Sequence, residues 1–186
     1  MPVQTRATPA PATPLERFNT APAAEAAQTL LACLHSHAWA HRLTAHRPYP
    51  DLPALLAAAD EAAYDLSPAD LTEALAAETL PALPEDTYAA AHTALNAAHA
   101  AYESRFGHVF VICLDGLSPD ETLNHVLAAI RSRLSNDRDE ERLVTAEELR
   151  HLAKTRLTNA LQGARGTARP ATDGPHPAFK DKPPPP

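Results

Sequence analysis

The sequence predicts an all-α, single-domain protein: a bundle of about seven helices with one short extended segment. Three observations favour this fold class. The chain of 186 residues is rich in alanine and leucine, and its apolar residues recur at helical spacing. Many of its 19 prolines separate these apolar repeats. Only one run, Val109 to Leu114, is continuously apolar with β-branched residues, so a sheet has no second strand to pair with.

Both ends of the chain differ in composition from the middle. Residues 1–14 and 164–186 are rich in proline, threonine, alanine and glycine, and the chain closes on Pro183–Pro186. Such segments bury too little apolar surface to offset the entropy lost on ordering. We therefore expect disordered tails on either side of a helical domain at residues 15–163.

Four helices are expected in the first half of that domain. The first runs from about Pro22 to Leu34, and the second from about His37 to Ala45. Asp51 is a good N-cap for the third helix. Ser67 followed by proline opens the fourth, which should end before Pro81.

The second half is predicted to hold the longest helix, from about Pro84 to Phe106, which Gly107 would end in a left-handed conformation. Val109 to Leu114 follows as a lone buried strand or an extended connector. Ser118-Pro-Asp-Glu121 is a capping box with proline at the first helical position. A last helix starts near Asp137 and ends near Gly163.

Charge and cysteine content narrow the function classes. The net charge is −7 without a basic stripe, which argues against nucleic acid and anionic membrane surfaces as partners. No apolar run is long enough to span a bilayer. Cys33 and Cys113 form no CxxC pair, so a reducing compartment, the cytoplasm, is expected.

Arg156 is the first candidate functional residue, because helical spacing places it on an apolar side of the last helix. The residues expected on that side are Leu149, Leu152, Ala153, Arg156 and Ala160. A desolvated guanidinium costs several kcal/mol unless it meets an anion or several acceptors. Arg156 is therefore predicted to form a structural ion pair, to hold a carboxylate-bearing ligand, or to extend its charge to the edge of the core.

Histidines give a second pattern. His92, Asn96, His99 and Glu103 share one side of the predicted long helix, which is either its solvated side or the wall of a pocket with titratable imidazoles. His37 and His41, one turn apart, have metal-ligand spacing, but no third carboxylate or thiolate lies near them in the sequence. No metal site is predicted.

Glu78 lies at the end of the fourth predicted helix, just before a proline-broken loop. It is either an exposed helix-end glutamate or, if partly buried, a general acid or base. The sequence contains no glycine-rich phosphate loop and no nucleophile elbow.

From about Leu15 to Leu161 the chain resembles the 2-oxo-4-hydroxy-4-carboxy-5-ureidoimidazoline (OHCU) decarboxylase family of purine and urate breakdown. The resemblance lies in the segments Arg17-Phe-Asn-Thr20, Trp39-Ala-His-Arg42, Arg47-Pro-Tyr-Pro-Asp-Leu52, Leu55-Leu-Ala-Ala-Ala-Asp60, Ala101-Tyr-Glu-Ser-Arg-Phe-Gly107, Phe110-Val-Ile-Cys113, Ile130-Arg-Ser-Arg-Leu-Ser-Asn-Asp137 and Arg156-Leu157. It implies an all-α, cofactor-free enzyme, often dimeric, that converts OHCU to (S)-allantoin.

The family's functional residues carry over in part. Arg156 matches the family arginine, and the substrate-binding backbone matches the residues Phe110, Val111, Ile112, Cys113 and Leu114. Glu78 stands where family members have a His-Pro pair. The family's Ser-x-x-Glu-Gln motif is missing, because the segment Leu80 to Asp86 is shortened and rich in proline.

The resemblance thus implies a lyase with Arg156 and Glu78 as catalytic groups, or with a histidine recruited from His92 or His99 to bind the substrate or transfer the proton. The implied partner is a small anionic ureidoimidazoline, with a homodimer as the expected assembly. Two other readings remain open: a non-catalytic module that binds a ureide, and a structural protein in which Arg156 pairs with an internal carboxylate.

Overall fold

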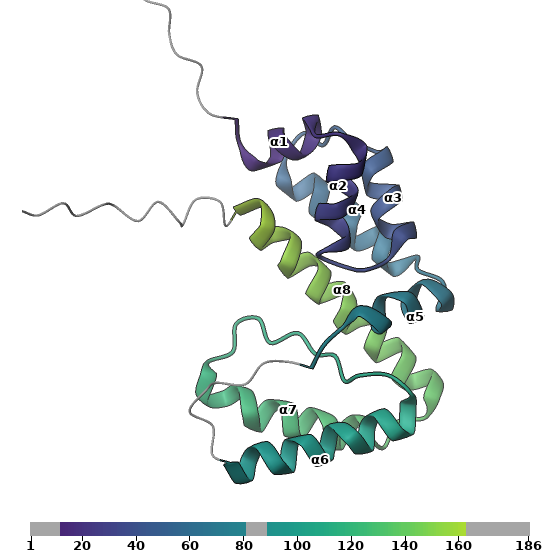
Figure 1. Cartoon of the computed structure of the whole chain (residues 1–186), viewed down its shortest axis with the longest axis vertical. Helices are drawn as coiled ribbons and strands as arrows, with labels where there is room; N and C mark the ends of the chain where they lie inside the picture. Colours follow the sequence, from purple (N-terminus) through teal and green to yellow (C-terminus); the bar gives the residue numbers. More distant parts are fainter. Residues whose placement is uncertain (1–11, 81–88, 163–186) are drawn as a thin grey trace, which may run out of the picture.

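A computed structural model describes residues 12–80 and 89–162, and within them it contains eight α-helices and no β-strand (Figure 1). The predicted all-α class is confirmed, and the number of helices is close to the predicted seven. The predicted tails lie outside the described residues except for positions 12–14. Positions 84–88, the expected beginning of the long helix, and Gly163 also lie outside them.

The helices follow one another with mostly short connections, and the connection from α6 to α7 is longer, at residues 107–118. Their bounds are α1 Pro14–Thr20, α2 Ala23–Leu31, α3 His37–Ala45, α4 Leu52–Tyr64, α5 Pro68–Ala77, α6 Ala89–Phe106, α7 Pro119–Arg133 and α8 Arg138–Gln162.

Helix α1 is the additional element, and it begins at Pro14, a residue that composition had assigned to the tail. Thr13 and Glu16 form a capping box around it: the Thr13 hydroxyl accepts from the Glu16 N–H at 3.2 Å, and Glu16 accepts from the Thr13 N–H at 2.7 Å. The proline-rich composition of the first residues hid this start signal.

The predicted caps are present. Asp51 accepts the N–H of Ala54 at 2.8 Å, and Ser67 forms a capping box with Asp70. Ser118 donates its N–H to the Glu121 carboxylate at 3.3 Å. Gly107 ends α6 with φ +83°, the left-handed conformation expected from the sequence.

Helix α8 has 25 residues and α6 has 18 described residues, and the predicted beginning of α6 lies outside the described part of the chain. One side of α8 is buried along nearly its whole length, through Glu141, Thr145, Leu149, Ala153, Leu157 and Leu161. The first two residues of this series, Glu141 and Thr145, are polar. The apolar pattern in the sequence therefore indicated only the second half of the buried side.

The helices enclose two hydrophobic cores. The first core lies between α1–α4 and the second half of α8, with Ala74 of α5 added, and α8 packs mainly against α4. The second core lies between α6 and α7, and its buried residues from these helices are Leu95, Tyr102, Val126 and Ile130. Figure 1 shows the two groups of helices one above the other, with α8 running past both.

The predicted extended segment connects α6 to α7 and separates these two cores. Val111 belongs to the first core, whereas its neighbours Phe110 and Ile112 belong to the second. Side chains that alternate between opposite sides are typical of an extended chain. The segment is therefore an extended connector, and it lies without a partner strand among the described residues.

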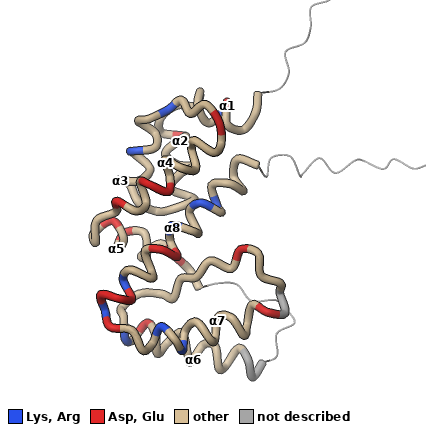
Figure 2. The backbone as a smooth tube through the Cα atoms, turned by 180° about the vertical axis from the view of Figure 1, so that it is seen from behind, with Lys and Arg blue, Asp and Glu red and all other residues tan. Residues whose placement is uncertain are grey.

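Charged residues of both signs are interspersed along the backbone (Figure 2). None of the described helices is both long enough and apolar enough to cross a membrane.

Candidate functional site

Arg156 of α8 and Glu78 at the end of α5 form a bidentate ion pair. Nη1 of Arg156 donates to Oε1 of Glu78 at 2.6 Å, and Nη2 donates to Oε2 at 2.8 Å. Nη1 also donates to the carbonyl oxygen of Cys33 at 3.2 Å. Parallel N–H···O bonds of this kind fix both the distance and the orientation of the two groups. The hydrogen bonds to Glu78, more than any other influence, raise the pKa of Arg156 above its usual value.

Glu78 reaches this position because α5 ends just before it. Its backbone is extended, with ψ 149°, and its N–H caps the helix by donating to the Leu75 carbonyl. The side chain is therefore directed inward and is only 7% exposed. Glu78 is therefore not an exposed helix-end glutamate, and its role as a general acid or base stays a prediction.

Arg156 lies at the edge of the buried side of α8 and not in its middle. Its side chain is 38% exposed, and Ala160, expected on the same apolar side, is exposed. Leu157 and Leu161 are buried instead. The side of α8 that was predicted to be buried differs by about one residue from the side that is buried. The buried residues of α8 recur every four residues, and Arg156 lies next to this series, at its boundary.

A cavity of about 310 Å³ lies in front of this pair. It is lined by Glu78, Thr79, Leu80, Val111, Ile112, Leu114, Leu152 and Arg156. The extended segment thus forms one wall and the ion pair another. The N–H and C=O of Ile112 have no hydrogen-bond partner in the part of the chain that the structure describes, and Ile112 is one of the residues that line the cavity.

The other residues predicted from the segment have other surroundings. Phe110 is fully buried in the second core. The N–H of Cys113 donates to Oε2 of Glu148 at 2.8 Å, and its thiol faces a separate hollow shared with Asp115 and Thr155. Of the five predicted residues, Val111, Ile112 and Leu114 therefore line the cavity. Phe110 and Cys113 do not line it.

Neither predicted histidine lies at this cavity. His92 is exposed on α6. His99 is 6% exposed and stacks on Phe110, with ring centroids 6.0 Å apart. Burial lowers the pKa of His99. The polar side of α6 is thus solvated at His92, Asn96 and Glu103 but not at His99.

The second histidine pattern also has a local explanation. His37 contacts the Glu73 carboxylate, and His41 is exposed. Within residues 12–80 and 89–162, no three side chains of the types that bind metals gather at one point.

The sequence interpretation missed Arg133, which positions the cavity wall. Its Nη1 donates to the Val111 carbonyl at 2.7 Å. Its Nε and Nη2 both donate to Oε1 of Glu141, at 2.8 and 2.6 Å, and Tyr102 and Thr145 complete the group. A signal was present, because Val126, Ile130 and Arg133 lie on one side of α7 at spacings of four and three.

This arrangement combines a fixed cation, the carboxylate bound to it, backbone amide groups without a partner among the described residues, and apolar walls. Cation and carboxylate together can stabilise charge and move a proton within one small volume. Free N–H and C=O groups suit a planar ligand that itself carries amides.

The chain was compared with protein families, with curated protein sequences and with solved structures. A model of the family described as OHCU decarboxylase matches residues 19–86 and 82–158. Among curated protein sequences, none matches the chain.

Two solved structures share the fold. A crystal structure of (S)-allantoin synthase is 23% identical with a TM-score of 0.62, over 81% of this chain and 54% of that one. A crystal structure of OHCU decarboxylase in the presence of (S)-allantoin is 21% identical with a TM-score of 0.61, over 71% of this chain and 96% of that one. The chain thus spans about half the length of the allantoin synthase and nearly all of the decarboxylase. On the family match, which covers most of its length, this chain belongs to the OHCU decarboxylase family.

Proposed function

We propose that this protein is a cofactor-independent carboxy-lyase of urate breakdown that converts OHCU to (S)-allantoin in the cytoplasm. The observation that carries the proposal is the bidentate Arg156–Glu78 pair at the wall of the 310 Å³ cavity. Family membership supports the reaction class, and the two structural relatives bear names that belong to the same conversion. Both described thiols are free, which suits a reducing compartment.

The cavity suits the substrate's amide-rich ring. In the proposed complex, the ureido and ring amide groups hydrogen-bond to the free N–H and C=O of Ile112. Leu114 and Leu152 cover the ring with apolar surface. An apolar wall beside the substrate carboxylate favours its departure, because CO₂ is uncharged and the carboxylate is not.

The reaction needs one bond to break and one carbon to be protonated. The bond between the ring and the carboxylate breaks, CO₂ leaves, and the electron pair enters the ring. A ring nitrogen takes one proton from solvent, which is the one proton that each turnover consumes. The substrate hydroxyl becomes a carbonyl of the product as its own proton moves to one face of the neighbouring ring carbon. Arg156 stabilises the developing negative charge. Glu78 accepts the proton of the substrate hydroxyl and returns it to the ring carbon, which fixes the hand of the product.

The direct test mixes freshly generated OHCU with the full chain and follows the circular dichroism of the allantoin formed. We expect an excess of (S)-allantoin that appears faster than the spontaneous reaction. Racemic product at the spontaneous rate would exclude the enzyme. Calorimetric binding of allantoin without turnover would instead identify a ureide-binding module. The homodimer remains a prediction, which sedimentation of the full chain would test.

A further inference from the structure

The extended connector between α6 and α7 is held by two side chains that come from different helices. Nη1 of Arg133, at the end of α7, donates to the Val111 carbonyl at 2.7 Å. Oε2 of Glu148, on α8, accepts from the Cys113 N–H at 2.8 Å. One side chain therefore supplies a donor and the other an acceptor, as a neighbouring β-strand would.

Each of these bonds orients one polar group of Ile112. Both peptide units of Ile112 are trans, so in each unit the C=O and the N–H point in opposite directions. The Val111 carbonyl shares its unit with the Ile112 N–H, and the Cys113 N–H shares its unit with the Ile112 carbonyl. Arg133 and Glu148 therefore fix the N–H and the C=O of Ile112, respectively, in the direction away from themselves. Ile112 lines the cavity, whereas Arg133 and Glu148 do not.

Glu148 belongs to a row of side chains on α8 that borders the cavity. Leu152 and Arg156 follow it at intervals of four residues, which places all three on one side of the helix. Leu152 lines the cavity, and Arg156 binds Glu78 at the cavity wall. Glu148 is partly buried, and the bond from the Cys113 N–H is its one side-chain hydrogen bond among the described residues. Glu148 thus connects this side of α8 to the connector.

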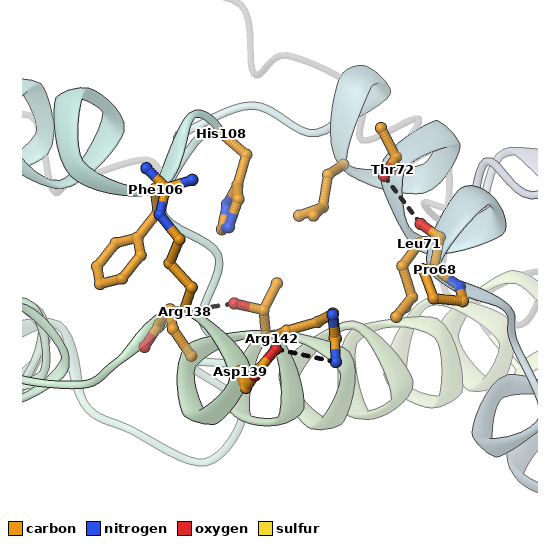
Figure 3. Close-up of a pocket in the computed structure, with 11 residues that line it drawn as sticks. Pro68, Leu71, Thr72, Phe106, His108, Arg138, Asp139 and Arg142 are labelled. Carbon is orange, nitrogen blue, oxygen red and sulfur yellow. Dashed lines mark hydrogen bonds and ion pairs between the residues drawn. The ribbon is translucent and has the colours of Figure 1, made fainter.

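Arg133 is less suited to a test than Glu148, because it is also held in the buried ion pair with Glu141. Glu141 and Thr145 border a separate hollow between the start of α5, the end of α6 and the first turns of α8 (Figure 3). None of the residues around that hollow lines the cavity at Arg156. A change at Arg133 would therefore disturb another part of the molecule as well as the connector.

We propose that Glu148 is a positioning residue for the decarboxylation. It fixes the peptide unit between Ile112 and Cys113, so that the Ile112 backbone meets a substrate that carries amide donors and acceptors of its own. This inference rests on the proposed function, because it names the side chain that orients the amide-binding wall of that site. Glu148 lies outside the cavity and touches no reacting atom. Its loss therefore weakens substrate binding and leaves the chemistry at Glu78 and Arg156 unchanged.

The test compares variants of Glu148 in the full chain. Glutamine keeps an oxygen that can accept from the Cys113 N–H, whereas alanine and leucine have no acceptor. We expect Glu148→Ala and Glu148→Leu to raise the KM for OHCU by about tenfold and to change kcat by less than about twofold, because the lost interaction acts equally on bound substrate and transition state. Glu148→Gln should keep both constants within about twofold of the unmodified protein.

The matched control is Glu147→Ala, which removes an exposed carboxylate from the same turn of α8 and should leave KM and kcat unchanged. Equal losses in Glu148→Gln and Glu148→Ala would overturn the positioning role, because they would trace the effect to the charge and not to the hydrogen bond. A lower kcat at unchanged KM would overturn it as well.

Calorimetric binding of allantoin to the same proteins separates this inference from the proposed function. If no protein turns over OHCU, the proposed function fails, yet about tenfold weaker allantoin binding in Glu148→Ala than in Glu148→Gln would still support the positioning role. If Glu148→Ala and the unmodified protein turn over OHCU with the same KM, the positioning role fails and the proposed function stands. Neither turnover nor allantoin binding in the unmodified protein would overturn both.

Discussion

Arg133 and Glu141 form an ion pair inside the protein, with Nη2 of Arg133 2.6 Å from Oε1 of Glu141 and side chains only 7% and 1% exposed. Desolvating two charges is costly, and here the cost is offset by further hydrogen bonds with Tyr102, Thr145 and Asn136. The pair joins α7 to α8 and, through the Val111 carbonyl, both helices to the wall of the cavity.

Glu141→Gln should strongly destabilise the protein. The change leaves the Arg133 charge buried without its counter-ion, which costs about 3–5 kcal/mol in comparable pairs. The measurement is the free energy of unfolding from urea titrations. Asp139→Asn, which removes the exposed partner of Arg142, is the control and should change this free energy little. Equal effects of the two changes would refute the assigned role of the buried pair.

Glu78→Gln and Arg156→Ala test the proposed catalytic pair. The first change replaces the carboxylate by an amide, and an amide cannot take up and return a proton. The second change removes the cation. Either change should therefore lower kcat by about 100-fold or more. The measurement is the initial rate of (S)-allantoin formation. Arg131→Gln is the control for loss of an arginine elsewhere, and it should retain the rate. Unchanged rates in both site variants would remove the pair from the mechanism.

His99 should make the protein less stable in mild acid. Burial lowers its pKa in the folded state, and neither ring nitrogen has a hydrogen-bond partner among the described residues. As the pH falls below the usual histidine pKa of about 6.5, His99 becomes protonated in the unfolded chain while it stays neutral in the folded protein. The free energy of unfolding therefore decreases below this pH, by at most about 1.4 kcal/mol per pH unit.

The measurement for His99 compares the free energy of unfolding at pH 7.5 and pH 5.5 in the unmodified protein and in His99→Phe. The variant should lose less stability between the two values, because the introduced phenyl ring keeps the stacking on Phe110 and does not titrate. The exposed histidines contribute equally to both proteins. Identical pH dependence in the two would contradict the expectation.

Gly107→Ala should destabilise the protein by about 1 kcal/mol, because its φ of +83° is unfavourable for a residue with a side chain. Among the described residues other than its two chain neighbours, no atom lies within 4 Å of the added methyl group, so the expected cost is one of backbone conformation. Thermal unfolding provides the measurement. Ser104→Ala, on the exposed side of the same helix, serves as the control and should not lower the Tm.

The sequence predicted well what depends on local patterns. Caps at Asp51, Ser67 and Ser118 and the left-handed Gly107 follow from neighbouring residues, so the helix boundaries near them were predicted correctly. Glu78 and Arg156 were chosen separately, one from a helix end and one from an apolar side. Their meeting was left open, because it depends on how α5 and α8 pack.

What the sequence did not reveal depends on contacts between distant segments. Glu141 and Thr145 are polar, so their burial on α8 could not be inferred before Arg133 and Tyr102 were placed beside them. His99 was grouped with a polar stripe, although the packing of Phe110 covers it. In each case a tertiary contact overrode a pattern that was read along one helix.

The alternation at Phe110, Val111 and Ile112 has a consequence for the evolution of this protein. Removing or inserting one residue there would turn the following side chains of the connector toward the opposite core and would point the Val111 carbonyl away from Arg133. Apolar substitutions of similar size keep that register. The connector should therefore tolerate exchanges of residue type while its number of residues stays constant among descendants of this chain.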